Sequence, residues 1–203
     1  SKELDTWKLV YKIILSDELD KFMHFIDLED NVKAVAIPLR DVEVEDPDMF
    51  MVSLRSKMPN VILQAINAKF VANIAHLWAV IRQAWVSKKK GISKVKFDLD
   101  IILRISCSSN LVGSLKAVGM KNGLQDVIFV GIGHGDHLQG IKEIIFRQGK
   151  SSNSLLFDSS EKTNFLKHYH GINDLALNSV LVKQNQLAAL LSEKATVIVD
   201  GRR

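Results

Sequence analysis

The sequence predicts a mixed α/β (α+β) fold: a single domain, residues 1–203, whose central, largely antiparallel or mixed sheet is flanked by about seven or eight helices. First, apolar stretches of strand length alternate along the chain with stretches whose apolar residues recur at helical spacing. Second, hydrophobic residues make up 47% of the chain, which is enough to bury one substantial core. Third, eleven glycines and three prolines leave no room for a long flexible linker.

The N-terminal part is expected to contain two strands and a helix. Apolar alternation with a period of two over residues 7–15 predicts a first strand. Ser16 and Asp17 are expected to cap a helix. Its apolar residues at helical spacing are Leu19, Phe22, Met23 and Ile26. Residues 35–38 are expected to form a short edge strand, because Pro38 lacks the backbone N–H that a central strand needs.

The next elements follow clear local signals. Residues 46–58 predict a helix with Pro47 in its first turn, where the missing N–H costs least, and residues 60–66 predict a strand. Residues 73–89 form the most convincing helix, which Gly91 is expected to end. Its apolar stripe consists of Ile74, Leu77, Trp78, Ile81 and Trp85.

The remaining elements complete the alternation. Residues 99–105 are apolar enough for a central strand, and residues 106–110 form a turn into a helix that ends at Gly119. One face of that helix is expected to carry Leu111, Leu115 and Val118. Residues 126–133 predict the last strand, and residues 138–146, 161–169 and 184–194 predict three further helices.

Charge is unevenly distributed along a chain with a net charge of +4. Five lysines and no acid lie between residues 88 and 96: Lys88, Lys89, Lys90, Lys94 and Lys96. These cations, close to a histidine expected to be exposed, His76, would contact a phosphate backbone. A solvated helix end is the alternative, and composition alone favours neither.

The turn over residues 106–110 has the sequence SCSSN and follows Ile105. It has two interpretations. Ser106 or the single cysteine, Cys107, is placed as a hydrolase nucleophile would be, on a turn between a strand and a helix. The glycines that flank a strained nucleophile turn are absent, however, because Ile105 and Cys107 flank Ser106. We therefore favour a structural role, in which a serine or Asn110 caps the next helix.

Two other motifs resemble ligand sites in part. Residues 131–137, GIGHGDH, contain a glycine cluster but match the spacing of neither common phosphate-binding motif. His134 with His137 and His168 with His170 have the spacing of metal ligands, but neither pair supplies three converging ligands. The sequence thus predicts no cofactor and no metal.

The surroundings of the protein are predicted from what its sequence contains. The longest apolar runs, such as residues 127–132, are strand-sized, and no N-terminal signal pattern is visible. One cysteine forms no internal disulfide. We expect a protein without a membrane partner that lies in the cytoplasm, and also in the nucleus if the source is eukaryotic.

Two segments together resemble one known family. In INAKFVANIAHLWAVIRQA, residues 66–84, Asn67-Ala68 and His76-Leu77 match its "NA" and "HL" pairs at a strand end and on the next helix. DIILRISCSSNLVGSLKAVGM, residues 100–120, resembles its second block, although Asp100 replaces the usual Glu. The family is the small non-catalytic subunit of the KEOPS complex, known as PRPK-binding or TPRKB-like proteins. The resemblance is best over residues 60–133, with a fainter echo in residues 186–200.

This resemblance implies a binding protein rather than an enzyme. Such a subunit would bind the kinase-like ATPase subunit of KEOPS and tRNA, including its 3′ CCA end, during threonylcarbamoylation of an adenosine beside the anticodon. Other KEOPS subunits would be indirect partners. The residues that we assign to tRNA are His76, Lys69, Arg82, Lys88, Lys89, Lys90, Lys94 and Lys96. Those that could contact the kinase, or pack on the core instead, are Leu187, Leu190 and Leu191. Alternatives are a hydrolase that uses Ser106 or Cys107, and a protein-interaction subunit without RNA contact.

Overall fold

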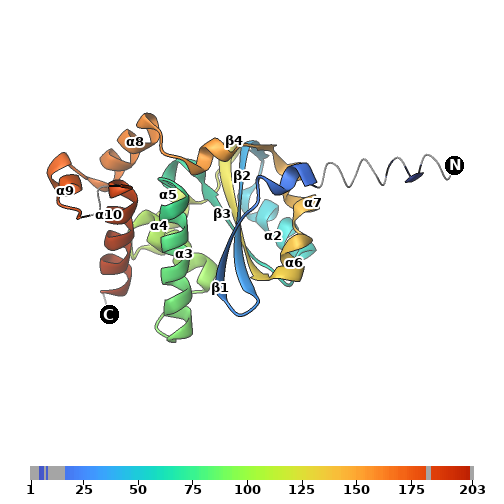
Figure 1. Ribbon diagram of the computed structural model, residues 1–203, viewed down its shortest axis with the longest axis horizontal. Helices are drawn as coiled ribbons and strands as arrows, with labels where there is room; N and C mark the ends of the chain where they lie inside the picture. Colours follow the sequence, from blue (N-terminus) through green and yellow to red (C-terminus); the bar gives the residue numbers. More distant parts are fainter. Residues whose placement is uncertain (1–4, 7, 9–16, 182–183, 202–203) are drawn as a thin grey trace.

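A computed structural model describes residues 5–6, 8, 17–181 and 184–201, and a five-stranded antiparallel sheet lies at its centre (Figure 1). The strands are β1 (His24–Glu29), β2 (Val32–Val44), β3 (Ile62–Asn67), β4 (Gly123–His134) and β5 (Lys150–Ser151). They are ordered β1-β2-β4-β3, and β5 pairs with Leu39 and Arg40 of β2. The predicted mixed fold is confirmed, and the sheet is antiparallel rather than mixed.

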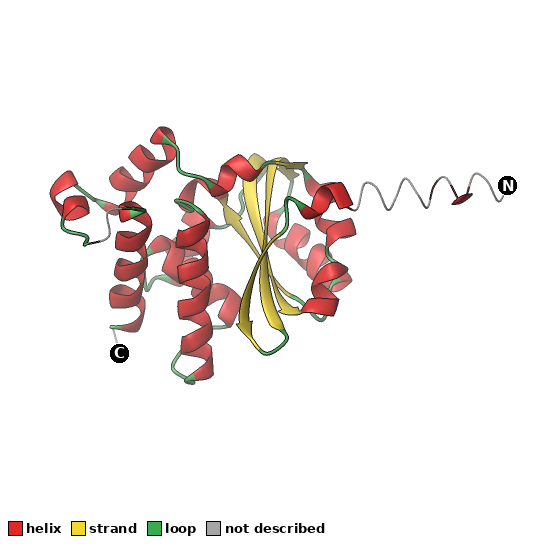
Figure 2. Cartoon of the chain, in the orientation of Figure 1, coloured by secondary structure: helices red, strands yellow, loops and turns green. Residues whose placement is uncertain are grey.

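Helices lie on both sides of this sheet (Figure 2). They are α2 (Pro47–Lys57), α3 (Ile74–Lys89), α4 (Phe97–Ser106), α5 (Leu111–Val118), α6 (Gly135–Gln139), α7 (Lys142–Ile145), α8 (Ser160–His170), α9 (Asp174–Asn178) and α10 (Gln186–Ala195). Short helical turns are η1 (Ala68–Phe70), η2 (Phe146–Gln148), η3 (Asn153–Leu156) and η4 (Thr196–Asp200). The helix predicted over residues 138–146 is thus several short pieces, whereas α8 and α10 confirm the other two predicted tail helices.

Alternation along β2 separates two cores. Ala34 and Ala36 point to the side covered by α3 and α4, where Leu77 and Ile101 pack. Val35 and Ile37 point to the other side, covered by α2, α6 and α7. Because both faces of the sheet are buried, β2 and β4 have near-continuous apolar sequences rather than alternating ones.

The edge-strand prediction for residues 35–38 is wrong, because β2 lies between β1 and β4. Pro38 is tolerated in this central strand for a local reason. On one side of β2 the pairing with β1 reaches only Ala36, and the pairing with β5 begins at Leu39. The Pro38 carbonyl accepts a hydrogen bond from the Ser152 N–H on that side, at 3.0 Å, so the missing N–H interrupts no ladder.

Two other secondary-structure predictions are wrong. Among the described residues, the predicted helix around Leu19 is helical only over residues 17–20, and Ile26 belongs to β1. Ser16, one of its two predicted caps, lies outside the described residues. Residues 99–105 belong to α4 and not to a strand. The residues of α4 are buried on nearly every side of the helix, and an apolar run of that length is equally typical of a buried strand and a buried helix.

The other local signals predicted their elements correctly. Asp46 caps α2 by accepting from the Met49 N–H at 3.0 Å, and Pro47 occupies the first turn. Asn73 caps α3, and Gly91 ends it with a φ of 65°. Strands β3 and β4 confirm the predictions for residues 60–66 and 126–133. The strand predicted over residues 7–15 lies almost entirely outside the described residues.

A further helical layer covers α3 and α4 on the side away from the sheet (Figure 1). It consists of α8, α9 and α10, and its core includes Leu166, Leu187 and Leu191. Cys107 at the end of α4 belongs to the same core. The C-terminal segment therefore packs against the helices and not against the sheet.

No single described helix is long and apolar enough to cross a membrane. Helices α4 and α5 reach that length and composition only when taken together, and they are bent by 76° with respect to each other.

Candidate functional site

The lysine cluster predicted from the sequence lies where α3 ends and α4 begins. Lys88 and Lys89 occupy the last turn of α3, and Lys90 is its C-cap. Lys94 is exposed in the connecting loop, and Lys96 is the N-cap of α4. The helix dipole favours cations at the end of α3, which helps to place three of them there. We call these five lysines the basic edge.

Aromatic rings position one cation of the basic edge. The Lys88 Nζ lies 4.9 Å from the centroid of the Trp85 ring and 5.7 Å from that of Phe97. The two rings meet edge to face, with centroids 5.6 Å apart. Cation–π attraction of this kind holds the Lys88 ammonium over a fixed platform while leaving it without an anionic partner.

Most of the basic edge is free of acidic partners. Lys89 pairs with Glu29 on β1 at 2.6 Å. Lys88, Lys90, Lys94 and Lys96 make no ion pair with another residue in the part of the chain that the structure describes. Exposed cations without carboxylate partners are available to phosphate groups.

A pocket of about 400 Å³ lies beside the basic edge, with Lys94 at its wall. Its polar lining includes Ser93, Asp100, Arg104 and Asp200. Loop 92–95, α4 and η4 therefore meet around one cavity.

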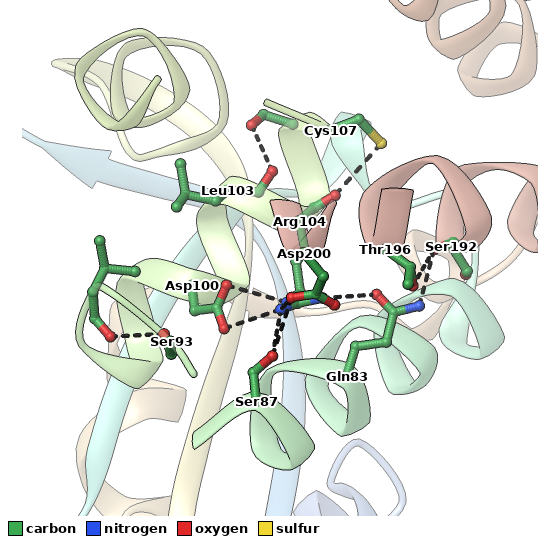
Figure 3. A network of polar contacts seen from close by, with 12 residues as sticks. Gln83, Ser87, Ser93, Asp100, Leu103, Arg104, Cys107, Ser192, Thr196 and Asp200 are labelled. Carbon is green, nitrogen blue, oxygen red and sulfur yellow. Dashed lines mark hydrogen bonds and ion pairs between the residues drawn. The ribbon is translucent and has the colours of Figure 1, made fainter. Parts of the chain in front are cut away.

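A buried arginine holds this region together (Figure 3). The Arg104 side chain is 1% exposed and lies between the Asp100 and Asp200 carboxylates. Its Nε donates to Asp100 Oδ1 at 3.1 Å, and its Nη2 donates to Asp200 Oδ1 at 2.6 Å. Each aspartate also accepts from Arg104 through its other oxygen, and Ser87 and Gln83 of α3 accept two further hydrogen bonds, at 2.9 and 3.3 Å. All of the guanidinium nitrogens are thus bonded, as a buried charge requires.

Burial also affects the acidic partner. It raises the pKa of the Asp100 carboxyl above its ordinary value, whereas the charge and hydrogen bonds of Arg104 act in the opposite direction. Every donor of Arg104 is directed at residues of this chain. We therefore assign the network a structural role: it attaches η4 to α3 and α4.

His76 does not lie at the surface, so the expectation of an exposed histidine is wrong. Its side chain is fully buried beneath the outer helical layer, and its Nδ1 accepts the Ala72 N–H at 3.1 Å. Burial lowers the pKa of His76 to about 3, with smaller contributions from His170 and Lys162. A nucleotide has no access to this ring in the folded chain.

The other residues assigned to tRNA are exposed but do not form one surface. Lys69 precedes α3 and lies over the rings of Phe70 and Phe165, at 5.5 and 4.8 Å. The basic edge lies at the opposite end of α3, a helix of 16 residues that spans about 24 Å. Arg82 is exposed on the same helix, between the two ends. The sequence alone did not show that Lys69 and the basic edge lie at opposite ends of α3.

The leucines considered for kinase contact belong to the protein core. Leu187 and Leu191 of α10 are 8% and 0% exposed, and Leu190 packs against the same cluster. The alternative that the sequence left open, packing on the core, is confirmed for these residues. The side chains of Leu187 and Leu191 are not accessible to a partner in this conformation, whereas Leu190 is partly exposed.

The turn once considered for a hydrolase has no catalytic geometry. Ser106 is buried in α4 and donates to the Leu103 carbonyl at 2.9 Å. Cys107 is 8% exposed, and burial raises the pKa of its thiol to about 11, against a smaller lowering by Lys194. Neither is hydrogen bonded to a histidine in the described structure. Asn110 caps α5 through the Gly113 N–H, which confirms the capping role of this turn.

The glycine and histidine motifs are also explained by the fold. Gly131 and Gly133 lie within β4, so this segment is a paired strand and not a phosphate-binding loop. The rings of His134 and His137 have centroids 6.0 Å apart. Among the described residues, no three His, Cys, Asp or Glu side chains are grouped as metal ligands would be.

Comparison with known proteins connects this geometry to a family. A search of curated proteins gave no match. A family model described as "Kinase binding protein CGI-121" matches residues 20–197, which is most of the chain and includes the sheet, α3 and α4. The sequence resemblance to the TPRKB-like proteins is thereby confirmed. The chain belongs to the CGI-121 family of kinase-binding proteins.

Proposed function

We propose that this chain is an accessory, non-catalytic subunit of the KEOPS complex that binds the kinase-like ATPase subunit and tRNA, including the 3′ CCA end. In that role it supports threonylcarbamoyladenosine modification, and it acts in the cytoplasm. The observation that carries the RNA part of the proposal is the basic edge, with four of its five lysines free of acidic partners among the described residues.

The chemistry of the basic edge supports a nucleic acid as its ligand. Each phosphate contact releases condensed counterions, so the affinity of such a surface decreases as salt increases. Lys88 is held over Trp85, and Lys90, Lys94 and Lys96 extend the charge along the loop into α4. Because such contacts are made to the backbone, we expect this edge to position tRNA and not to read its sequence.

The surroundings of the two candidate nucleophiles, Ser106 and Cys107, support a binding role over a hydrolase. Cys107 and Ser106 point into the core and bond to backbone carbonyls, at 3.4 and 2.9 Å. A kinase partner follows from the description of the family, and the kinase-like subunit of KEOPS is the kinase that we propose.

Filter binding with tRNA at two salt concentrations tests this proposal. Changing Lys90 and Lys94 to Glu should weaken tRNA binding and reduce its salt dependence. A matched control changes Lys116 and Lys121, exposed lysines outside the basic edge, to Glu and should retain binding. Removal of the CCA end should weaken binding to the unaltered chain.

Two results would contradict the RNA part of the proposal. In the first, the chain binds the kinase in a pull-down but does not bind tRNA. This result would indicate a subunit that contacts protein alone. The other is equal loss of tRNA binding in both lysine variants, which indicates a response to net charge and not to the basic edge.

A further inference from the structure

Helix α2 carries on its outer side a stripe of two apolar and two small polar residues that the fold does not use. Its inner side packs Met51 and Leu54 against the sheet. On its outer side, Met49 and Val52 are 65% and 60% exposed. The spacing of the outer residues Met49, Val52, Ser53 and Ser56 is i, i+3, i+4 and i+7, as in a helix face that packs against another element. Among the described residues, nothing covers this stripe.

A groove adjoins this stripe at Met49 and Ser53, and the exposed Val52 lies beside its lining. It has a volume of about 560 Å³ and lies between the end of β2, the outer side of α2 and Gln148 at the end of η2. Met49, Phe50 and Ser53 contribute to its lining. We call this feature the α2 groove. The small side chain of Ser53 permits close approach by a second helix, because the distance between packed helices depends on the side chains at their contact.

Acidic residues border the α2 groove at the N-terminal end of α2. Glu43, Glu45 and Asp46 line it, and Asp48 is exposed in the first helical turn. None of these four carboxylates makes an ion pair with a described residue. One cation, Lys57, lines the groove at the other end of the helix. The groove is therefore acidic on a chain whose net charge is +4.

We propose that the α2 groove docks a basic amphipathic helix of a protein partner. The apolar side of that helix packs on Met49 and Val52, and its lysines or arginines face the carboxylates at the end of β2. Binding of a helix in a groove uses apolar anchors at this spacing, and complementary charge adds specificity and speed of association. An RNA ligand does not fit, because the groove would place its phosphates against Glu43 and Glu45.

This docking surface goes beyond the proposed function. It lies on the side of the sheet covered by α2, whereas α3 and α4, which carry the basic edge, cover the opposite side (Figure 1). A test with model peptides needs neither the kinase nor tRNA. Its failure is therefore distinguishable from a failure of the proposed function.

Two fluorescent amphipathic helical peptides with the same leucine face are suitable probes. One has lysine and the other has glutamate on its polar face. Anisotropy titrations of the full chain should show binding of the lysine peptide that weakens with added salt, and no binding of the glutamate peptide. The variants Val52→Asp and Glu43→Lys/Glu45→Lys should each weaken binding of the lysine peptide by about tenfold or more.

Matched controls separate the groove from nonspecific attraction. Val112→Asp changes an exposed valine of α5, which is 65% exposed, and Asp30→Lys changes an acid in the turn after β1. Both controls should bind the lysine peptide like the unaltered chain. Circular dichroism and urea unfolding confirm that each variant is folded.

Three results would overturn the proposal. Equal binding of both peptides, or no binding of either, would show that the groove does not select a basic helix. An equal effect of Val52→Asp and Val112→Asp would place binding elsewhere. Sedimentation that reveals a dimer, lost in Val52→Asp, would identify a second copy of this chain as the occupant.

Discussion

Arg104 and Asp200 lie 96 positions apart in the sequence, yet the Arg104 Nη2 donates to Asp200 Oδ1 at 2.6 Å. This pair joins the last described turn of the chain to α4, which packs against the sheet. Since the arginine is 1% exposed and the aspartate is 25% exposed, the contact is largely shielded from solvent. The pair therefore attaches the C-terminal segment to the rest of the fold.

Replacing Arg104 with Leu should destabilise the protein strongly. The change leaves the Asp100 carboxylate buried without its partner, and breaking one side of a buried pair costs about 3–5 kcal/mol. Urea unfolding followed by circular dichroism measures the loss. The matched control, Lys89→Ala, breaks the exposed pair with Glu29 and should cost no more than about 1 kcal/mol. Similar losses in both variants would contradict the buried role of Arg104.

Replacing Asn73 with Ala should cost more than an ordinary helix cap. Its Oδ1 accepts the His76 N–H at 3.0 Å, and its Nδ2 donates to Asp158 and Asn185, both at 3.1 Å. We expect a loss of about 2–3 kcal/mol in the free energy of unfolding. Asn110→Ala removes a cap at the start of α5 and should cost about 1 kcal/mol. Equal losses would show that the bonds of Asn73 to the outer helical layer add nothing.

Acid should destabilise the protein through two histidines, the buried His76 and the half-buried His170. Burial lowers the pKa of His76 from 6.5 to about 3 and that of His170 from 6.5 to about 4. Below pH 6.5 the unfolded chain takes up protons that the folded chain does not, so stability decreases as the pH falls. Above that pH the neutral rings carry no such penalty.

The contribution of His76 can be isolated by substitution. In His76→Gln the stability should change less steeply between pH 6 and pH 4, by up to about 1.4 kcal/mol per pH unit. Urea unfolding at several pH values provides the slope. His168→Gln, which alters an exposed ring, is the control and should keep the original slope. An unchanged slope in His76→Gln would mean that His76 is accessible to protons in the folded state.

The thiol of Cys107 should react slowly in the folded protein. Its pKa is raised to about 11 by burial, and it lies in the core shared with α10. Reaction with a disulfide reagent at pH 8 should be at least about 100-fold slower than in the urea-unfolded chain, because both thiolate and access are lacking. A fast reaction without urea, or labelling by a thiol-directed activity probe, would restore the hydrolase alternative.

The sequence by itself determined the elements whose signals are local. Asp46 and Pro47 predicted the start of α2, and Asn73 and Gly91 predicted the ends of α3. Capping depends on hydrogen bonds between residues two or three positions apart, and a positive φ depends on a single residue. The lysines of the basic edge could also be located from the sequence, because they are nearly contiguous in it.

Only the tertiary structure decided the features that depend on distant neighbours. The apolar run of α4 is helical because other elements bury it on nearly every side, and Pro38 lies in a central strand because β1 ends before reaching it. His76 is buried because the outer helical layer covers α3. Arg104 finds Asp200 across most of the C-terminal half of the chain. Burial and pairing of this kind depend on how the chain folds back on itself, and no short stretch of sequence contains that information.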